Sequence, residues 1–482
     1  MNLRAVFKLV SFVLMVVGLA MAISWGVSLY FHDPLSARRG LAFSAILTLL
    51  VGVVVRIITH GPIELTWRDG IGIGTLGWFV AVVFGAIPFI WSGVIRDPVA
   101  ALFETVSGFT TTGASVIAVI ETVPKGILFW RAMTHFLGGM GILVLCVAIL
   151  PFLGVGGMQL YKAEVAGPSK DRLTPRITNT AKLLWFVYVL LFVLATSLLK
   201  FGGMSWFDAI CHAAATVATG GFSTRTASIA AYNNVYIEIV ITVFMFLGAT
   251  NFALHYGALR GKVFGYFRDP EFRFFLCVWA VACGVITLNT WHAVYPSASA
   301  ALRNSVFSAT SIMSTTGFCT ADFNTWPAFS KVILVLCMLV GGCVGSTGSG
   351  IKHLRLFIVL KKAIRQIKLF VHPQAVMQVK LDRQPVDDNI VLNVVTFVML
   401  YVLVLVIASA IMTLFTHDML AAVTSTIACT GNVGPGLGAV GPTLNYMAIP
   451  WGGKIVLIFC MLLGRLEFYT MLALLFPSFW KK

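Results

Sequence analysis

Long apolar runs alternate with short polar segments along most of the 482-residue chain. A helix that spans a bilayer needs about 20 mostly apolar residues, and these runs, extended through sparsely charged flanks, predict ten such helices. We therefore expect an all-α polytopic membrane protein. The ten runs lie at residues 9–30, 42–55, 71–95, 136–160, 183–199, 239–252, 274–294, 332–349, 390–415 and 455–463.

Four half-length amphipathic runs, each too short to span, interrupt this pattern at residues 99–109, 207–217, 302–313 and 420–429. Each leads into a polar stretch rich in Thr, Ser and Gly, and these stretches recur at intervals of roughly 100 residues. Lipid does not tolerate irregular backbone at membrane depth, so the four stretches must meet in protein or around water. The pattern predicts four helix–pore loop–helix repeats with pseudo-fourfold symmetry around one pore.

The chemistry of the four loops fits a cation filter. A ring of backbone carbonyls can replace the hydration shell of an ion, glycine reaches positive φ without strain, and the negative dipole ends of the half-helices favour a cation. One such loop would more simply indicate helix packing by small residues, but four at near-equal spacing indicate a pore. The expected filter residues are Thr111, Thr112, Gly113, Thr219, Gly220, Gly221, Thr315, Thr316, Gly317, Asn432, Val433 and Gly434.

A glycine-rich segment at residues 341–350 interrupts the second spanning helix of the third repeat. We expect it to be a flexible loop beneath the filter that opens and closes the path; the alternative is a kink at a helix crossing. It matches a phosphate-binding loop poorly, because Lys352 does not follow the last glycine directly. Its glycines are Gly341, Gly342, Gly345, Gly348 and Gly350.

Arg465 lies within the last apolar run. A charge in the middle of a span faces a partner or a water-filled cavity by default, and Glu467 is no helical partner for it because residues i and i+2 do not face each other. We expect Arg465 to point into the pore below the filter, as an electrostatic barrier or as a latch on the glycine-rich segment. The alternative is snorkelling to the inner surface.

Other polar residues favour structural roles. Glu104 and Asp208 are expected to stabilise the first turns of two half-helices, although an acidic outer vestibule would use the same residues. His135, His212 and His255 form no ligand pattern and are interpreted as histidines that are either hydrogen-bonded within the protein or interfacial. The stretch Gly138–Gly141 is interpreted as helix packing within a full span. Nine scattered cysteines predict neither a disulfide framework nor a metal site.

The formal charge of +16 is informative because of the side of the membrane on which the basic residues lie. With the N-terminus in the cytoplasm, most of the 34 Lys and Arg lie on that side, as the positive-inside rule requires. We therefore expect cytoplasmic N- and C-termini and no nucleic-acid binding. The basic segment 352–383 predicts docking of a regulator or of anionic membrane lipids. The apolar stretch that begins at Leu9 continues to Tyr30, longer than the core of a signal peptide, so we expect a retained anchor.

The four loops, the glycine-rich segment and Gly464-Arg465-Leu466-Glu467 resemble the Trk/Ktr/HKT superfamily of potassium transporters. The similarity runs essentially end to end and includes residues 150–161, 268–273 and 432–438. It implies filter glycines at Gly113, Gly221, Gly317 and Gly434, a gating loop at 341–350 and a pore arginine at Arg465. Family members with four filter glycines tend to select potassium, whereas serine in the first filter goes with sodium. Cys319, beside the third filter, has no explanation.

The resemblance also implies a homodimer with one pore per protomer, regulated by a cytoplasmic nucleotide-binding ring of the TrkA type. It divides the chain into an N-terminal helix pair at 1–69 and repeats at 70–172, 173–267, 268–384 and 385–482. We expect a multi-pass protein of the bacterial inner membrane, not an enzyme, that passes potassium inward under the membrane potential and binds no cofactor of its own. The alternative is a proton- or sodium-coupled potassium symporter, which would want ionisable relays within the spans; the sequence leaves coupling open.

Overall fold

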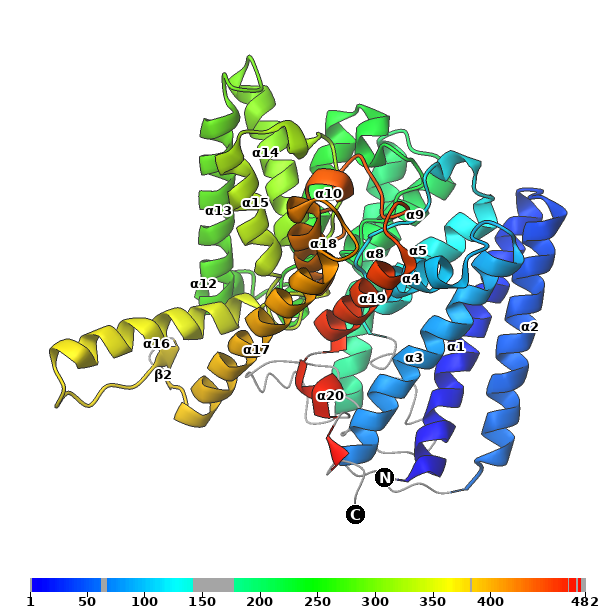
Figure 1. Cartoon of the computed structure of the whole chain (residues 1–482), viewed down its shortest axis with the longest axis horizontal. Helices are drawn as coiled ribbons and strands as arrows, with labels where there is room; N and C mark the ends of the chain where they lie inside the picture. The colour runs from blue at the N-terminus through cyan, green and yellow to red at the C-terminus, as the bar shows by residue number, and fades with distance from the viewer. Residues whose placement is uncertain are drawn as a thin grey trace.

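The computed structural model describes residues 2–61, 67–141, 177–381, 384–466, 468–473 and 476–477. Helices make up most of this part (Figure 1), which confirms the predicted all-α fold. Its single sheet is a hairpin of two short strands, β1 (Lys380–Leu381) and β2 (Gln384–Pro385). The long apolar runs therefore form helices, because a helix satisfies its own backbone hydrogen bonds inside lipid.

The first two helices, α1 (Leu3–Tyr30) and α2 (Leu35–Ile58), form a hairpin at one side of the molecule (Figure 1). The turn between them is tied to helix α5 (Lys125–Gly139). The carboxylate of Asp33 accepts hydrogen bonds from the backbone N–H groups of Lys125 (3.1 Å) and Gly126 (2.7 Å). These N–H groups have no partner within a helix, so the hairpin caps the start of α5.

Four successive sets follow, each with a first helix, a short helix and a second helix. They are α3 (Trp67–Trp91), α4 (Pro98–Phe109) and α5; α8 (Ile177–Phe201), α9 (Trp206–Val217) and α10 (Val235–Gly248); α13 (Pro270–Thr290), α14 (Ala298–Met313) and α15 (Ala328–Leu339); and α17 (Asp388–Met412), α18 (Met419–Gly431) and α19 (Trp451–Leu466). The connecting helices are α11 (Phe252–Leu259), α12 (Gly265–Arg268) and α16 (His353–Val371), and α20 (Phe468–Ala473) follows α19.

The short helices α4, α9, α14 and α18 are the four predicted half-helices. Their N-caps are side chains that accept a backbone N–H: Asp97, Ser205, Ser297 and Asp418. This capping fixes the start of each helix. In α14 the cap Ser297 places the first helical residue, Ala298, four residues before the predicted Leu302.

Two of the predicted spans are not continuous helices. Six described helices are long and apolar enough to span a membrane: α1, α2, α3, α8, α13 and α17. The run at 239–252 breaks after Gly248, and α11 leaves α10 at an angle of 104°. The run at 332–349 stops as a helix at Leu339, where the glycine-rich segment was predicted to interrupt it.

The run at 136–160 lies mostly outside the described residues, as do the 150–161 motif and Glu467. In the described part, α5 ends at Gly139 and Gly141 has φ of +73°. The glycines are therefore at a helix end and not in the middle of a span, which corrects that prediction. Their packing role is confirmed, because a Cβ at Gly138 would collide with the carbonyl of Phe109.

Candidate ion pathway

All four half-helices end in the same backbone conformation. A left-handed residue ends each of them: Thr111 (φ +56°), Thr219 (+53°) and Thr315 (+60°) directly after the C-cap, and Asn432 (+53°) at the C-cap. The next N–H then bonds to a carbonyl five residues back, as from Thr112 to Ser107 (2.8 Å) and from Thr316 to Ser311 (2.9 Å). Gly220 and Val433 make the equivalent bonds, both at 2.8 Å. This is the Schellman helix ending, repeated four times.

Threonine is an unusual residue for this position. A β-branched side chain at positive φ is a genuine outlier, and such strain, about 1–3 kcal/mol per residue, persists only where the surroundings enforce it and where it serves a site. Three of the four loops carry threonine there, and all three side chains are buried. The strained conformation turns the chain sharply away from the half-helix into the predicted filter segment.

The four predicted filter glycines lie side by side with the neighbouring loops. Gly113, Gly221, Gly317 and Gly434 all have positive φ, between +78° and +97°. A Cβ at each would lie closer than 3.0 Å to the carbonyl oxygen of the next loop: Gly220, Thr316, Val433 and Thr112, in that order. These four carbonyls belong to equivalent residues, the ones directly before the glycines. The contacts close on themselves, so the loops form a ring in chain order.

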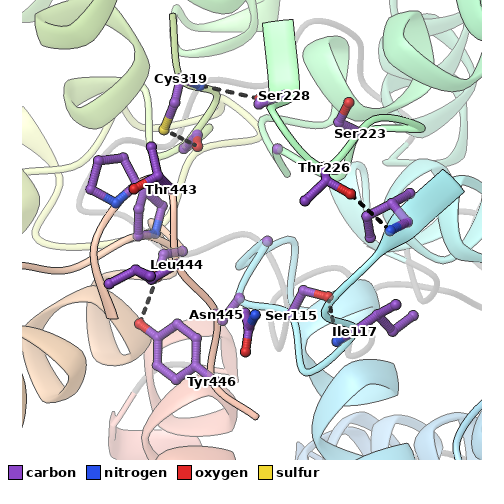
Figure 2. Close-up of a pocket in the computed structure, with 18 of the residues that line it drawn as sticks. Ser115, Ile117, Ser223, Thr226, Ser228, Cys319, Thr443, Leu444, Asn445 and Tyr446 are labelled. Carbon is purple, nitrogen blue, oxygen red and sulfur yellow. Dashed lines mark hydrogen bonds between the residues drawn. The ribbon is translucent and has the colours of Figure 1, made fainter. Parts of the chain in front are cut away.

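A cavity of about 100 Å³ opens on one side of this ring. All four filter glycines line it, and Figure 2 shows segments from the four repeats around it, including those of Ser115, Ser223, Cys319 and Tyr446. Hydrogen bonds join each pair of neighbouring segments at this level: Ile120 N–H to Thr226 Oγ1, Cys319 N–H to Ser228 Oγ, Gly438 N–H to Asn324 Oδ1 and Tyr446 N–H to Ser115 O.

The cavity wall carries arginines, not the acidic residues of the vestibule alternative. Arg131 lines it and pairs at 2.6 Å with Glu104, which is fully buried within α4. Glu104 also accepts hydrogen bonds from Ser115 Oγ (3.0 Å) and Val116 N–H (2.8 Å). Its predicted place in the first turn is wrong, because α4 starts at Pro98 and Asp97 is its cap. Glu104 instead neutralises Arg131 and holds the segment after the first filter.

Asp208 does lie in the first turn of α9, as predicted, but its carboxylate has further partners. It accepts hydrogen bonds from Ser205 Oγ (2.9 Å) and Thr224 Oγ1 (2.5 Å) and pairs at 3.3 Å with Arg225, the second arginine of the cavity. A buried charge needs such pairing. Both arginines at the cavity are therefore compensated, and a cation entering it meets polar oxygens beside two neutralised pairs.

The glycine-rich segment folds back beneath the ring, at the half-helix ends of the loops. Val340 and Ile351 form a bridge that closes it. Thr347 Oγ1 donates to the carbonyls of Val217 (3.0 Å) and Gly248 (2.9 Å), at the ends of α9 and α10. The backbone N–H of Cys343 donates to Ala249 O (2.8 Å). The carbonyls freed by the break after α10 are thus used by this segment, which gives a physical reason for the break.

The left-handed threonines of the loops contact the same segment. Thr315 Oγ1 accepts the N–H of Ser349 at 3.1 Å, and Thr219 Oγ1 lies 3.3 Å from Thr347 Oγ1. On the far side of the segment, Glu271 Oε1 accepts the N–H groups of Val344 (2.8 Å) and Leu354 (3.0 Å). The segment is therefore held between the loops and the start of α13.

Arg465 lies under the ring, against the glycine-rich segment. Its guanidinium donates to Thr347 O (2.9 Å), Ser349 Oγ (3.2 Å) and Gly139 O (2.8 Å), and also to Gly138 O. A longer contact of 3.5 Å reaches Thr111 Oγ1. Because these partners lie in the interior of the protein, the geometry disagrees with snorkelling and matches the predicted inward orientation.

Several of these partners carry no sequence signal. Arg131 was not singled out, and the contacts of Glu271 and of the Gly138 and Gly139 carbonyls were not predicted, because they join segments far apart in the chain. The prediction that His135, His212 and His255 are hydrogen-bonded is confirmed. Cys319 donates its thiol to Gly317 O at 3.5 Å. The eight cysteines in the described ranges are free thiols, and those ranges hold no cluster of His, Cys, Asp and Glu fit for a metal.

Comparisons with known proteins agree on one family. Residues 42–482 match the family model described as TrkH, cation transport protein. The chain is 40% identical over 488 residues to the Trk system potassium uptake protein TrkH of Halomonas elongata, with both chains fully covered. It is 38% identical to TrkG of Escherichia coli over 87% of each chain. The crystal structure of the potassium transporter TrkH from Vibrio parahaemolyticus superimposes with a TM-score of 0.89 at 35% identity, covering both chains completely.

Proposed function

The chain belongs to the TrkH family of cation transport proteins, and from that premise we propose that it passes potassium across the bacterial inner membrane through the ring of four loops. The family consists of transport proteins, which confirms that the chain is not an enzyme. The relatives carry names of potassium uptake proteins. Potassium is accordingly the transported substrate in this proposal, and the filter is the ring of loops around Gly113, Gly221, Gly317 and Gly434.

The observation that carries the proposal is the closed ring of equivalent carbonyls. The carbonyls of Thr112, Gly220, Thr316 and Val433 come from one position in each loop, and each adjoins a glycine of the next loop. Four oxygens at equivalent positions can replace the water molecules around a dehydrated potassium ion. The half-helices end at the ring, so their negative dipole ends favour a cation there.

The gate in this proposal is the segment 341–350 together with Arg465. The support is its position at the inner ends of the loops and its direct contacts with the filter threonines. Arg465 adds a positive charge next to this segment and four interior hydrogen bonds. A cation that has passed the ring would meet the segment 341–350 and the charge of Arg465. Moving the segment would require breaking the hydrogen bonds of Thr347 and of Arg465.

The driving force in this proposal is the membrane potential, which is worth about 2.3 kcal/mol per charge per 100 mV. The regulator is a cytoplasmic nucleotide-binding ring of the TrkA type, and the protein works as a homodimer with both termini in the cytoplasm. Supporting this orientation, helix α16 carries Lys361, Lys362, Arg365 and Lys368 and extends from the body beside α17 (Figure 1). Basic residues accumulate on the cytoplasmic side of membrane proteins.

The test is rubidium uptake into liposomes that contain the purified protein, with sodium as competitor, for the wild type and Gly113→Ser. We expect rubidium uptake that sodium inhibits poorly in the wild type and much more strongly in the variant. A serine Cβ would collide with Gly220 O, so the ring must distort. Uptake only in the presence of a proton or sodium gradient would identify a coupled symporter, and equal discrimination in both proteins would remove the first loop from the filter.

A further inference from the structure

The second helix of the first repeat, α5, runs along the ring of loops and places a polar stripe against it. Arg131, Thr134, His135, Gly138 and Gly139 recur at spacings of three and four residues, which puts them on one face of a helix. Arg131 lines the outer cavity, and the carbonyls of Gly138 and Gly139 bind Arg465 on the inner side. His135 therefore lies between these two levels, at the height of the filter.

His135 contacts half-helix α4 and the second loop at once. Its Nδ1 lies 2.7 Å from the carbonyl of Gly108, near the end of half-helix α4, and its Nε2 lies 3.1 Å from the backbone N of Phe222, directly after the second filter glycine. The ring also stacks on Phe222, with 4.0 Å between the ring centroids. It is fully buried. The two hydrogen bonds join the first repeat to the filter loop of the second.

The hydrogen-bond partners define the chemical state of this ring. A carbonyl can only accept and a backbone N–H can only donate, so Nδ1 must carry the proton and Nε2 must present its lone pair. No other side chain offers a donor and an acceptor held on one rigid ring at this spacing. The imidazole is thus a fixed spacer between two backbone groups, and not merely a filler of the core.

The position of this spacer matters for the ring of carbonyls. Gly220 packs directly on the imidazole, and a Cβ there would lie 2.5 Å from the ring's Cδ2 atom. The carbonyl of Gly220 is the one that adjoins Gly113 of the first loop. Holding Phe222 and Gly220 against His135 therefore fixes how closely this carbonyl approaches the first loop.

The third and fourth loops are braced differently. Ser311 Oγ donates to Phe318 O (2.7 Å), and Tyr446 Oη donates to Gly434 O (2.7 Å). Each of these braces belongs to the same repeat as the loop that it holds. Other contacts cross between repeats, such as the hydrogen bond from Asn432 Nδ2 of the fourth loop to Thr112 Oγ1 of the first (2.8 Å). His135 is of this second kind, because it belongs to the first repeat and holds the loop of the second.

We propose that His135 is a positioning residue that sets the potassium-over-sodium discrimination of the filter by linking its first and second loops through a neutral, Nδ1-protonated imidazole. This inference rests on the proposed filter function. Discrimination between two cations depends on the size of the ring and on the field of its carbonyls. A loop that can shift relative to its neighbour lets the ring adapt to the smaller ion.

The experiment measures rubidium uptake and its inhibition by sodium in liposomes for two substitutions of His135. Each substitution is chosen to keep a different one of its two hydrogen-bonding groups. His135→Asn keeps an amide donor near the Nδ1 position and loses the acceptor for Phe222. His135→Gln places an amide oxygen near the Nε2 position and keeps that acceptor. We expect discrimination to fall by up to about tenfold in His135→Asn, the effect of one lost buried hydrogen bond, and by less in His135→Gln.

A control separates this role from general packing. His255→Asn removes another buried histidine, bonded to Tyr266 and Leu247 away from the filter, and should keep the wild-type discrimination. Wild-type discrimination in His135→Asn, or an equal loss in His255→Asn, would overturn the proposal.

A measurement on the wild type does not depend on the folding of any variant. In protein labelled with ¹⁵N-histidine, nuclear magnetic resonance should show neutral imidazole protonated at Nδ1, and its absence would overturn the proposal. Gly113→Ser separates this inference from the filter itself. If that substitution changes discrimination and His135→Asn does not, the filter stands and the role of His135 fails; if neither changes it, the filter assignment fails.

Discussion

The second helices of the first and third repeats meet the ring of loops in opposite ways. Helix α5 continues past the ring and touches it with side chains on one face. In the third repeat, α15 ends at Leu339 and the chain passes beneath the ring as the glycine-rich segment. The loops of these two repeats are not neighbours in the ring, so one wall of the pathway is a helix and the wall across from it is a loop.

In the proposed function, this difference lets one fold hold the filter still and leave the gate movable. The contacts of α5 come from side chains with two or more partners each, such as Arg131 with Glu104 and Ser223. The glycine-rich segment is held mainly by its own residues Thr347 and Ser349, which bond to the loops and helix ends above it, and by Glu271 beside it. Segments with few anchors open at lower free energy than packed helices.

The largest effect is expected where the two walls meet the ring itself. Gly221→Ala introduces a Cβ closer than 3.0 Å to Thr316 O at a φ of +78°, and strain of about 1–3 kcal/mol follows from the backbone alone. We expect at least a tenfold loss of rubidium uptake or of its resistance to sodium. Gly257→Ala is the matched control, because nothing lies within 4 Å of its Cβ; equal effects in both variants would contradict the account.

The next effect tests the contact between the walls. Arg465→Gln removes the guanidinium that joins the carbonyls of Gly138 and Gly139 to Thr347 and Ser349. We expect cation flux in the absence of any regulator to rise about tenfold, because both a positive charge and several buried hydrogen bonds are lost. Patch recording or liposome flux measures this. Unchanged or lower flux in a protein of normal stability would rule out the latch.

A smaller effect is expected within the glycine-rich segment. Thr347→Val keeps the shape of the side chain and removes the hydroxyl that binds Val217 O and Gly248 O. Basal flux should rise several-fold, with discrimination unchanged. Ser346→Ala is the control, since its hydroxyl bonds only to Cys343 in the same segment. A rise in Ser346→Ala as large as that in Thr347→Val would show that the bonds to α9 and α10 do not hold the segment.

The smallest effect concerns the hydrogen bonds that hold the start of helix α5. Asp33→Asn weakens the cap that the N-terminal hairpin places on α5, a loss of about 1 kcal/mol. The unfolding midpoint in detergent should fall by about 1 °C, with little change in flux. Asp387→Asn is the comparison variant, because Asp387 caps the helix that directly follows it, α17, whereas Asp33 caps a helix far away in the chain. A large change in discrimination with no change in stability would contradict a purely mechanical role for Asp33.

Much of this architecture could be predicted from local sequence patterns, but contacts between residues far apart in the chain could not. Three half-helices end at the predicted residues because their apolar runs stop at polar, glycine-containing loops, and Asp97 and Ser205 cap the starts of two of them. Glu104 was misjudged because its partner Arg131 is 27 residues away. The break after α10 was missed for the same reason, since the loop that uses its free carbonyls lies about 100 residues later.

The filter residues stood out in the sequence because they repeat, whereas the residues that hold them do not. Gly113 and its three counterparts each follow a half-length apolar run at near-equal spacing, and the structure brings all four together. His135 has no counterpart pattern in the sequence, and its meaning depends on Gly108 and Phe222 lying on either side of its ring. Only the folded geometry shows such a residue.

The most direct measurement of the central claim is anomalous diffraction from crystals soaked in thallium or rubidium. A cation-binding ring predicts a peak on the axis among the carbonyl oxygens of Thr112, Gly220, Thr316 and Val433, lost or displaced in Gly113→Ser. Anomalous density elsewhere in the molecule, with none inside the ring of loops, would contradict the account.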